Sequence, residues 1–370
     1  MDKELKFPFY AKASFFFIGF FAFVSMLYIA QGIIIPLLFS IIVAIVLHPV
    51  VNFFVRKKMN RIVAIVIALI LAFIIMAAFA TLLFSQANRF IETLPILIDK
   101  FIEVLNNTVT WLSEYFDIST QKINSWIKNT EGELINTSGS AIGQTIVTVG
   151  GMVVLLFLIP VYIFMLLFYQ PLLLEFFRRL FGANNRNEVN EVITEIKSLI
   201  QRYLIGLLIE TAIIAALYTI GLLIMGIEYA IILGIIGALL NLIPYIGSWI
   251  AASLPMIIAI VTKSSPWFAL LVLALYIFIQ FIDNNYIVPK IVASKVKINA
   301  LISIIAVIAF GALWGIPGML IAIPLTAIIK LIFDHIEPLK PWGFLLGDTM
   351  PDITIFKIKL KKMGKGNSEK

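Results

Sequence analysis

The chain has 370 residues, of which 61% are hydrophobic and 13% are charged, and its formal net charge is +7. A soluble globular domain is about half apolar and about one quarter charged. This composition therefore excludes a soluble domain and predicts an all-α protein that crosses a membrane several times. The chain contains no cysteine, which excludes disulfides and thiolate metal sites.

The N-terminal part, 1–84, is expected to hold three membrane-spanning helices. No charged residue lies between Lys12 and Arg56, and this run is far longer than the about 7–15 apolar residues of a signal peptide. Two spans joined by a tight turn fit that length, and a third span follows a basic loop. The expected spans cover 13–31, 33–54 and 62–84.

The region 85–144 is polar, and we expect it to form helices outside the cytoplasm. Its apolar residues recur at spacings of three and four, which resembles a heptad seam. The seam is expected to pack on the membrane bundle or on a neighbouring subunit of a homo-oligomer. Its residues are Ile91, Leu94, Ile98, Phe101, Leu105 and Leu112.

The region 145–202 is expected to contain a fourth span, over 145–169, and a cytoplasmic helix over 186–202. Apolar residues of the second segment follow the i, i+3, i+4, i+7 spacing, so that one helix face is apolar. Such a helix is expected to lie on the membrane surface or against the bundle.

Two uncharged stretches, 229–262 and 298–329, are too long for one span of about 20 residues and short for two. Each follows a predicted span, over 203–226 and 266–288, and each is interrupted by proline and glycine. We expect two re-entrant hairpins, and the alternative is four short, tilted spans. The expected hairpin breaks are Pro244, Gly247, Pro255, Gly315, Pro317, Gly318 and Pro324, and Pro289 is expected to end the helix before the second hairpin.

The distribution of basic residues predicts the orientation. With the N-terminus in the cytoplasm, the inner segments hold 23 of the 28 Lys and Arg residues, as the positive-inside rule requires. The two hairpins then enter from opposite sides, which makes 203–333 an inverted repeat of the kind found in secondary transporters. We expect 203–333 to form a transport core, and 334–370 to form a basic cytoplasmic tail.

A few polar side chains within the apolar segments are candidates for the substrate or ion pathway. Acidic groups inside a membrane are costly and usually face a cavity or carry a cation or proton. Three of these candidates have a structural alternative. Asp283 could cap a helix at the membrane interface, and the Glu210 carboxyl could hydrogen-bond to a neighbouring helix or subunit. Asn241 could hydrogen-bond to backbone groups left without partners at the break in the helix. The candidates are Asp283, Asn284, Asn285, Gln280, Glu210 and Asn241.

The sequence shows no phosphate-binding loop, no Ser-His-Asp arrangement and no metal-ligand spacing. We therefore expect no enzymatic activity, no cofactor and no metal, and transport that is passive or driven by an ion gradient. The excess of positive charge is explained by membrane sidedness, so that no nucleic-acid partner is expected. The expected partners are the lipid bilayer and a small hydrophilic solute or cation.

Three motifs resemble the signature of the autoinducer-2 exporter family of bacterial membrane proteins. They are NLIPYIG at 241–247, QFIDNNYIVP at 280–289 and GALWGIPGMLIAIP at 311–324. The resemblance extends over about residues 10 to 340. One departure is Leu207, which follows Gly206 where family members often carry glutamine, so no role of that glutamine can be transferred.

The resemblance implies a multi-pass protein of the bacterial inner membrane with both termini in the cytoplasm. It also implies export of a small hydrophilic solute such as autoinducer-2 by alternating access. Some members of the family are similar to sodium/proton antiporters in activity, which is the first alternative function. A second alternative is a non-transporting scaffold whose extracytoplasmic helices bind a partner.

Overall fold

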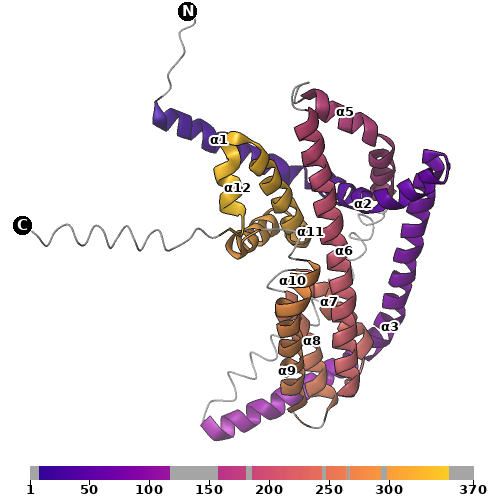
Figure 1. Ribbon diagram of the computed structural model, residues 1–370. Coiled ribbons are helices and arrows are strands. Elements are labelled where there is room, and N and C mark those ends of the chain that lie inside the picture. The colour runs from indigo at the N-terminus through magenta and orange to yellow at the C-terminus, as the bar shows by residue number, and fades with distance from the viewer. Residues whose placement is uncertain are drawn as a thin grey trace, which may run out of the picture.

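The computed structural model describes residues 8–116, 157–180, 186–243, 247–263, 265, 267–292 and 298–349. Within these ranges the secondary structure is helical, apart from one isolated antiparallel bridge between Ile298 and Gly347. Six of these helices are long and apolar enough to cross a membrane, and a bent helix pair supplies a seventh span if it is counted as one. The prediction of an all-α polytopic membrane protein is confirmed (Figure 1).

The N-terminal region consists of α1 (Phe9–Ile29), α2 (Gln31–Arg56) and α3 (Arg61–Phe116). The expected tight turn falls at Ala30, and the second turn is the basic loop before Arg61. No residue of α1 is buried, as is common for an apolar helix that faces lipid. α3 continues as one helix beyond the predicted third span. Most side chains of the heptad seam lie outside the described residues, so its packing partner stays a prediction.

The helix Phe157–Phe168 is followed by α5 (Gln170–Leu180), and the two are bent by 63° relative to each other. The next helix, α6 (Arg186–Ile224), is 39 residues long. The segment predicted as a separate cytoplasmic helix, 186–202, is therefore continuous with the fifth span. The part of the predicted fourth span before Phe157 lies outside the described residues.

The first broken stretch forms α7 (Ala230–Asn241) and α8 (Gly247–Thr262), which pack against each other. A Cβ atom on Gly247 would lie 1.7 Å from the carbonyl oxygen of Leu240, so only glycine permits this approach of α8 to the end of α7. Pro255 lies inside α8 and does not break it, which corrects that expectation. Pro244 lies outside the described residues.

The next span does not end at Pro289 as expected. α9 (Trp267–Ile282) continues through a π-helical turn, η2 (Asp283–Ile287), into the short α10 (Val288–Ile291). Pro289 lies in α10, and because it has no N–H it leaves a carbonyl of the preceding turn without its helical hydrogen bond. The helical run therefore ends two residues after the proline.

The second broken stretch, α11 (Ala300–His335), is a hairpin rather than one straight helix. Gly315 has φ 64° and ψ −146°, a conformation that is almost restricted to glycine. The two arms pack on each other, since Val307 of the first arm and Ala322 of the second belong to one buried cluster. At the start of the second arm, a Cβ on Gly318 would lie 2.0 Å from the carbonyl oxygen of Phe310.

Of the prolines in this stretch, Pro317 follows the break and Pro324 lies inside the second arm, which stays helical there. Pro324 is therefore not a hairpin break, which corrects that expectation. Both broken stretches fold back beside a glycine, whereas their re-entrant path through the membrane and their inverted orientation stay predictions.

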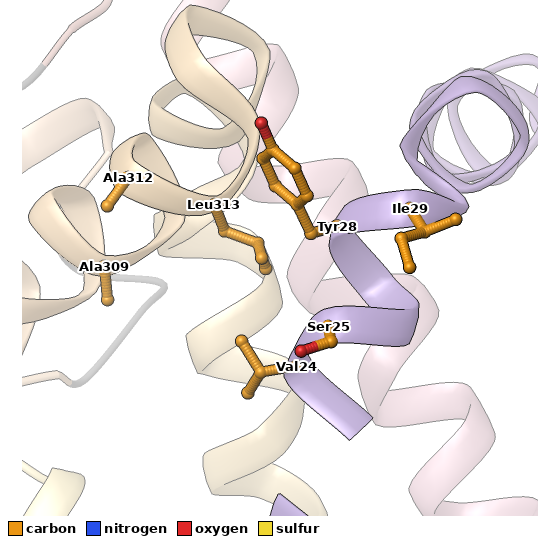
Figure 2. Close-up of a pocket in the computed structure, with 7 residues that line it drawn as sticks. All are labelled: Val24, Ser25, Tyr28, Ile29, Ala309, Ala312 and Leu313. Carbon is orange, nitrogen blue, oxygen red and sulfur yellow. The ribbon is translucent and has the colours of Figure 1, made fainter. Parts of the chain in front are cut away.

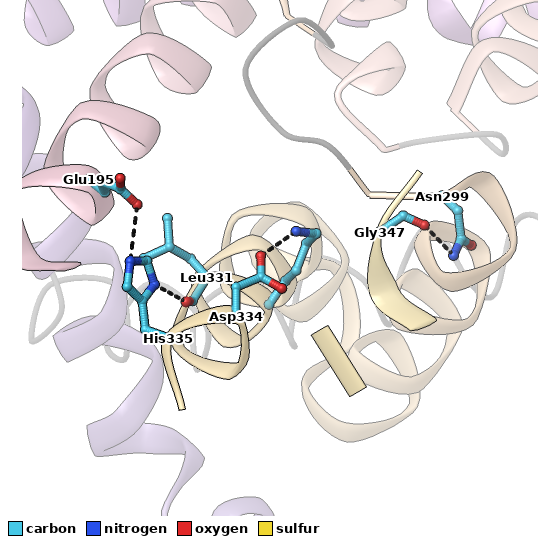
Figure 3. Close-up of polar contacts among 7 residues, drawn as sticks. Glu195, Asn299, Leu331, Asp334, His335 and Gly347 are labelled. Carbon is cyan, nitrogen blue, oxygen red and sulfur yellow. Dashed lines mark hydrogen bonds and ion pairs between the residues drawn. The ribbon is translucent and has the colours of Figure 1, made fainter. Parts of the chain in front are cut away.

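The C-terminal helices η4 (Glu337–Leu339) and α12 (Lys340–Leu346) close the base of this second hairpin (Figure 3). The Asn299 side chain donates hydrogen bonds to the carbonyl oxygens of Leu345, at 2.7 Å, and Gly347, at 3.0 Å, while it also caps α11. At the other end of α11, the Nε2 atom of His335 lies 3.8 Å from the Oε2 atom of Glu195 on α6. The base of the hairpin is thus tied to both α12 and α6.

The main buried core lies where α6, α7, α8 and α9 meet. Its members include fully buried Ile214 and Tyr218 of α6, Leu233 of α7, Ala259 of α8 and Val272 of α9. A second core joins α2, α3 and the helix Phe157–Phe168. The first of these cores contains two of the residues considered below, Tyr218 and Tyr276.

The close approach at Gly318 predicts that Gly318→Ala lowers the free energy of unfolding by about 1–3 kcal/mol, because the added methyl group overpacks the hairpin. Thermal unfolding of the detergent-purified protein, followed by tryptophan fluorescence, measures this loss. Gly19→Ala in α1 is the matched control, since nothing lies within 4 Å of the added methyl group. Equal melting temperatures for the two variants would contradict the close approach.

Candidate functional site

Four polar or charged side chains are buried within the described part of the chain: Ser40, Glu210, Asp283 and Thr326. The two hydroxyl groups donate hydrogen bonds to carbonyl oxygens four residues earlier in their own helices, each at 2.7 Å. They therefore need no further partner. The two carboxyl groups form no such hydrogen bond within their own helices.

Asp283 is the first residue of the π-helical turn and is 1% exposed. Its Oδ2 atom accepts a hydrogen bond from the Nδ2 atom of Asn241 at 3.0 Å. Asn241 is the last residue of α7, so this bond joins the turn of the first hairpin to the end of α9. π-helical turns are rare and frequently occur at functional sites.

Glu210 projects from α6 and is 7% exposed. It lies near enough to Asp283 for the two negative charges to interact. Ile214 and Tyr218 follow it at intervals of four residues on the same helix and are fully buried, which shows that this face of α6 is turned into the core.

Two tyrosines continue the polar region toward the other end of the bundle. The rings of Tyr218 and Tyr276 stack with centroids 4.1 Å apart and an angle of 13° between their planes. They pack on Gly237 of α7, where a Cβ atom would lie 3.1 Å from the Tyr276 hydroxyl oxygen. The site is therefore lined by α6, α7 and α9.

We call Glu210, Tyr218, Asn241, Tyr276, Gln280 and Asp283 the polar cluster. Four of its buried side-chain atoms have no hydrogen-bond partner among the described residues: the hydroxyl oxygens of Tyr218 and Tyr276, Oε1 of Gln280 and Oδ1 of Asp283. A buried polar atom without a partner costs about 1–3 kcal/mol. Such atoms are normally satisfied by water, an ion or a ligand. The cluster can thus offer hydroxyl donors together with carboxylate and amide acceptors.

The structure brings together four of the six residues singled out from the sequence: Asp283, Asn241, Glu210 and Gln280. The other two, Asn284 and Asn285, are exposed. Nδ2 of Asn285 donates to the carbonyl oxygen of Phe281 at 2.8 Å, and Oδ1 of Asn284 lies 3.4 Å from Nε2 of Gln280.

Sequence reasoning missed Tyr218 and Tyr276. A signal was available, since Tyr276 lies seven residues before Asp283 and Tyr218 eight residues after Glu210. Both intervals are close to two helical turns, so each tyrosine lies near the helix face of its carboxyl group.

The cavity shown in Figure 2 is a separate feature. It has a volume of about 490 Å³, lies between α1 and the first arm of α11, and is lined mainly by apolar groups, with Tyr28 and Ser25 as the polar exceptions. No residue of the polar cluster lines it. No group of three or more His, Asp or Glu side chains suited to a metal ion occurs among the described residues.

Comparison with known proteins places these features in a family. A family model described as the AI-2E family transporter matches residues 15–337. This match includes every residue of the polar cluster and both hairpins.

Individual relatives match over most of their length. YueF of Bacillus subtilis, provisionally named a transport protein, is 27% identical over 88% of this chain and 88% of its own. YrrI of the same organism, also provisionally named a transport protein, is 27% identical over 83% of this chain and 87% of its own. The AI-2 transport protein TqsA of Escherichia coli is 25% identical over 86% of this chain and 90% of its own.

The contact between Asn241 and Asp283 predicts a coupling that a double-mutant cycle can measure. Asn241→Leu leaves a buried carboxylate without its donor, so we expect the free energy of unfolding to fall by about 1–3 kcal/mol. Adding Asp283→Leu is expected to recover part of this loss, because the unpartnered charge is removed as well. Unfolding in detergent, followed by circular dichroism, gives the four free energies.

Asn285→Leu is the matched control, because it changes an exposed amide two residues from Asp283. We expect it to lower the free energy of unfolding by less than Asn241→Leu does. Strictly additive effects of the Asn241 and Asp283 substitutions would show that the two side chains are not coupled.

Proposed function

This chain belongs to the AI-2E family of transporters, and we propose that it exports a small hydrophilic solute of the autoinducer-2 type through the polar cluster. The protein is a multi-pass membrane protein and a transporter rather than an enzyme.

The observation that carries the proposal is the set of four buried polar atoms that find no hydrogen-bond partner in the described part of an otherwise apolar bundle. A solute with several hydroxyl groups both donates and accepts hydrogen bonds. The phenols of Tyr218 and Tyr276, the Gln280 amide and the free Asp283 oxygen match this pattern. A purely apolar solute would leave all four atoms unsatisfied.

The name of one relative supports the substrate class. TqsA is called an AI-2 transport protein, and it aligns with 86% of this chain. Autoinducer-2 is the solute to test first for that reason.

The bond between Asn241 and Asp283 supports a route for conformational change. It connects the turn of the first hairpin to the π-helical turn, and both are departures from regular α-helix. We propose that solute binding competes for Asp283, releases Asn241 and lets the hairpin move relative to α9. This is the local event expected in alternating access.

Sodium/proton antiport is a second candidate, favoured by the pair of buried carboxyl groups. The charges of Glu210 and Asp283 interact, and two buried carboxylates near each other resist being ionised together. A sodium ion that binds to both would offset the repulsion and displace a proton, so that the two ions would exchange.

Asp283→Asn is expected to slow release of autoinducer-2 from loaded proteoliposomes by about 10- to 100-fold, the effect of losing a hydrogen bond to a charged group. Release is measured with a bioluminescent reporter strain. Asn285→Ala changes an exposed amide, so its release rate is expected to stay within about twofold of the wild-type rate. Release from wild-type liposomes no faster than from protein-free liposomes would contradict solute export.

The antiport candidate predicts that a sodium gradient across the same proteoliposomes moves protons, read with an internal pH dye. Both Asp283→Asn and Glu210→Gln are expected to abolish the signal while the variants elute as folded protein. A sodium-dependent signal that survives both substitutions would place ion exchange elsewhere. If wild-type protein releases autoinducer-2 but gives no sodium-dependent proton signal, antiport is excluded and solute export is retained.

A further inference from the structure

The helix α5 combines an abrupt change of direction with an exposed apolar face. The chain bends by 63° at Tyr169, between the helix Phe157–Phe168 and α5. α5 lies beside the N-terminal end of α6 (Figure 1). Five large apolar side chains follow the i, i+1, i+4, i+5, i+8 spacing, so they share one helix face. They are Leu172, Leu173, Phe176, Phe177 and Leu180, and all are exposed.

Glu175 and Arg178 lie on the opposite face of α5, and Arg179 lies at the edge of the apolar face. Arg178 and Arg179 form ion pairs with Glu175, at 3.7 Å and 3.1 Å. Nε of Arg178 also donates to Oδ1 of Asn190 at 2.9 Å, which ties the end of α5 to α6. Arg179 stays 77% exposed in spite of its ion pair, so its guanidinium can reach groups outside the protein.

The start of α5 is tied to the basic loop between α2 and α3. Nη2 of Arg61 donates to the carbonyl oxygen of Leu167 at 2.6 Å and lies 3.3 Å from Oε1 of Gln170, the first residue of α5. Arg56, Lys57 and Lys58 of the same loop are exposed. Basic groups therefore lie at both ends of α5, while the acidic residues of α5 and of the adjoining end of α6 are Glu175, Glu188, Glu191 and Glu195.

An apolar crevice of about 350 Å³ opens at the bend. Its lining comes from α2, from the helix Phe157–Phe168 and from the first turn of α5, and it exposes almost no polar surface. Residues of the lining include Leu37, Tyr162, Met165, Tyr169, Leu172 and Leu173. The crevice is continuous with the apolar face of α5 through Leu172 and Leu173.

We propose that α5 lies in the plane of the membrane surface and that α5, with the crevice at its start, binds an anionic phospholipid. The crevice takes an acyl chain, and the basic groups at the ends of α5 attract the negative headgroup. Charge complementarity selects this occupant, because a zwitterionic lipid would fill the crevice equally well but gain less from the arginines and lysines. The proposal does not depend on which solute is transported.

Spin labelling tests the placement of α5, and the cysteine-free chain needs no background substitutions. Labels at Phe177→Cys and Arg179→Cys, which lie on nearly opposite sides of the helix, are compared in liposomes made of equal parts phosphatidylglycerol and phosphatidylcholine. We expect oxygen, which partitions into lipid, to relax the label at 177, and a water-soluble nickel chelate to relax the label at 179. Preferential relaxation of the 177 label by the nickel chelate would overturn the in-plane placement.

Lipid titration tests the headgroup preference. Native mass spectrometry of the detergent-purified full chain measures binding of phosphatidylglycerol and of phosphatidylcholine. We expect the wild type to prefer phosphatidylglycerol by about tenfold or more, and the double variant Arg178→Gln/Arg179→Gln to lose about tenfold of that preference.

The control variant Lys263→Gln/Lys290→Gln removes the same charge elsewhere on the chain, and we expect it to keep the preference. All variants are first checked for a single elution peak, because the changed side chains are on the surface. Equal binding of the two lipids by wild type, or an equal loss in both double variants, would overturn the proposed site.

Discussion

A carboxylate buried inside an apolar helix bundle has no bulk water to solvate it, and the core of this protein is arranged around that constraint. Asp283 is almost completely buried and takes one hydrogen bond from Asn241. To make this bond, α7 has to end beside the last turn of α9, and the chain has to reverse at once into α8. The hairpin, the π-helical turn and the close packing of α6 at Gly237 all serve to bring polar groups together in an apolar bundle.

Much of the fold could be predicted from the sequence, because charge-free runs and basic loops report directly on membrane spans. The two broken stretches were also located correctly, since the reversal at Gly315 and the contact of Gly247 with Leu240 need glycine. Pro255 and Pro324 were misjudged, because proline inside a membrane helix is tolerated when the surrounding structure compensates for the missing hydrogen bond. A sequence pattern cannot show that compensation.

The candidate site was predicted only in part. Asp283, Glu210 and Asn241 are conspicuous as polar residues in apolar runs, and the structure gathers them. Tyr218 and Tyr276 read as ordinary residues of an apolar face, and their importance comes from stacking between two helices that are distant in sequence. Asn284 and Asn285 were attractive because they follow Asp283, but the helix directs them away from the core.

The π-helical turn at 283–287 has a mechanical consequence. An α-helix rotates by about 100° per residue, and a π turn holds one residue more than an α turn. If that residue were taken up into regular α-helix, the segment after Asp283 would swing by about 100° around the helix axis as a unit. At its far end the carbonyl of Ile291 rests on Gly206 of α6, where no side chain obstructs it. The segment from Asp283 to Ile291 can therefore rotate as a unit, because the extra residue of the π turn permits the rotation at one end and Gly206 presents no side chain to block it at the other.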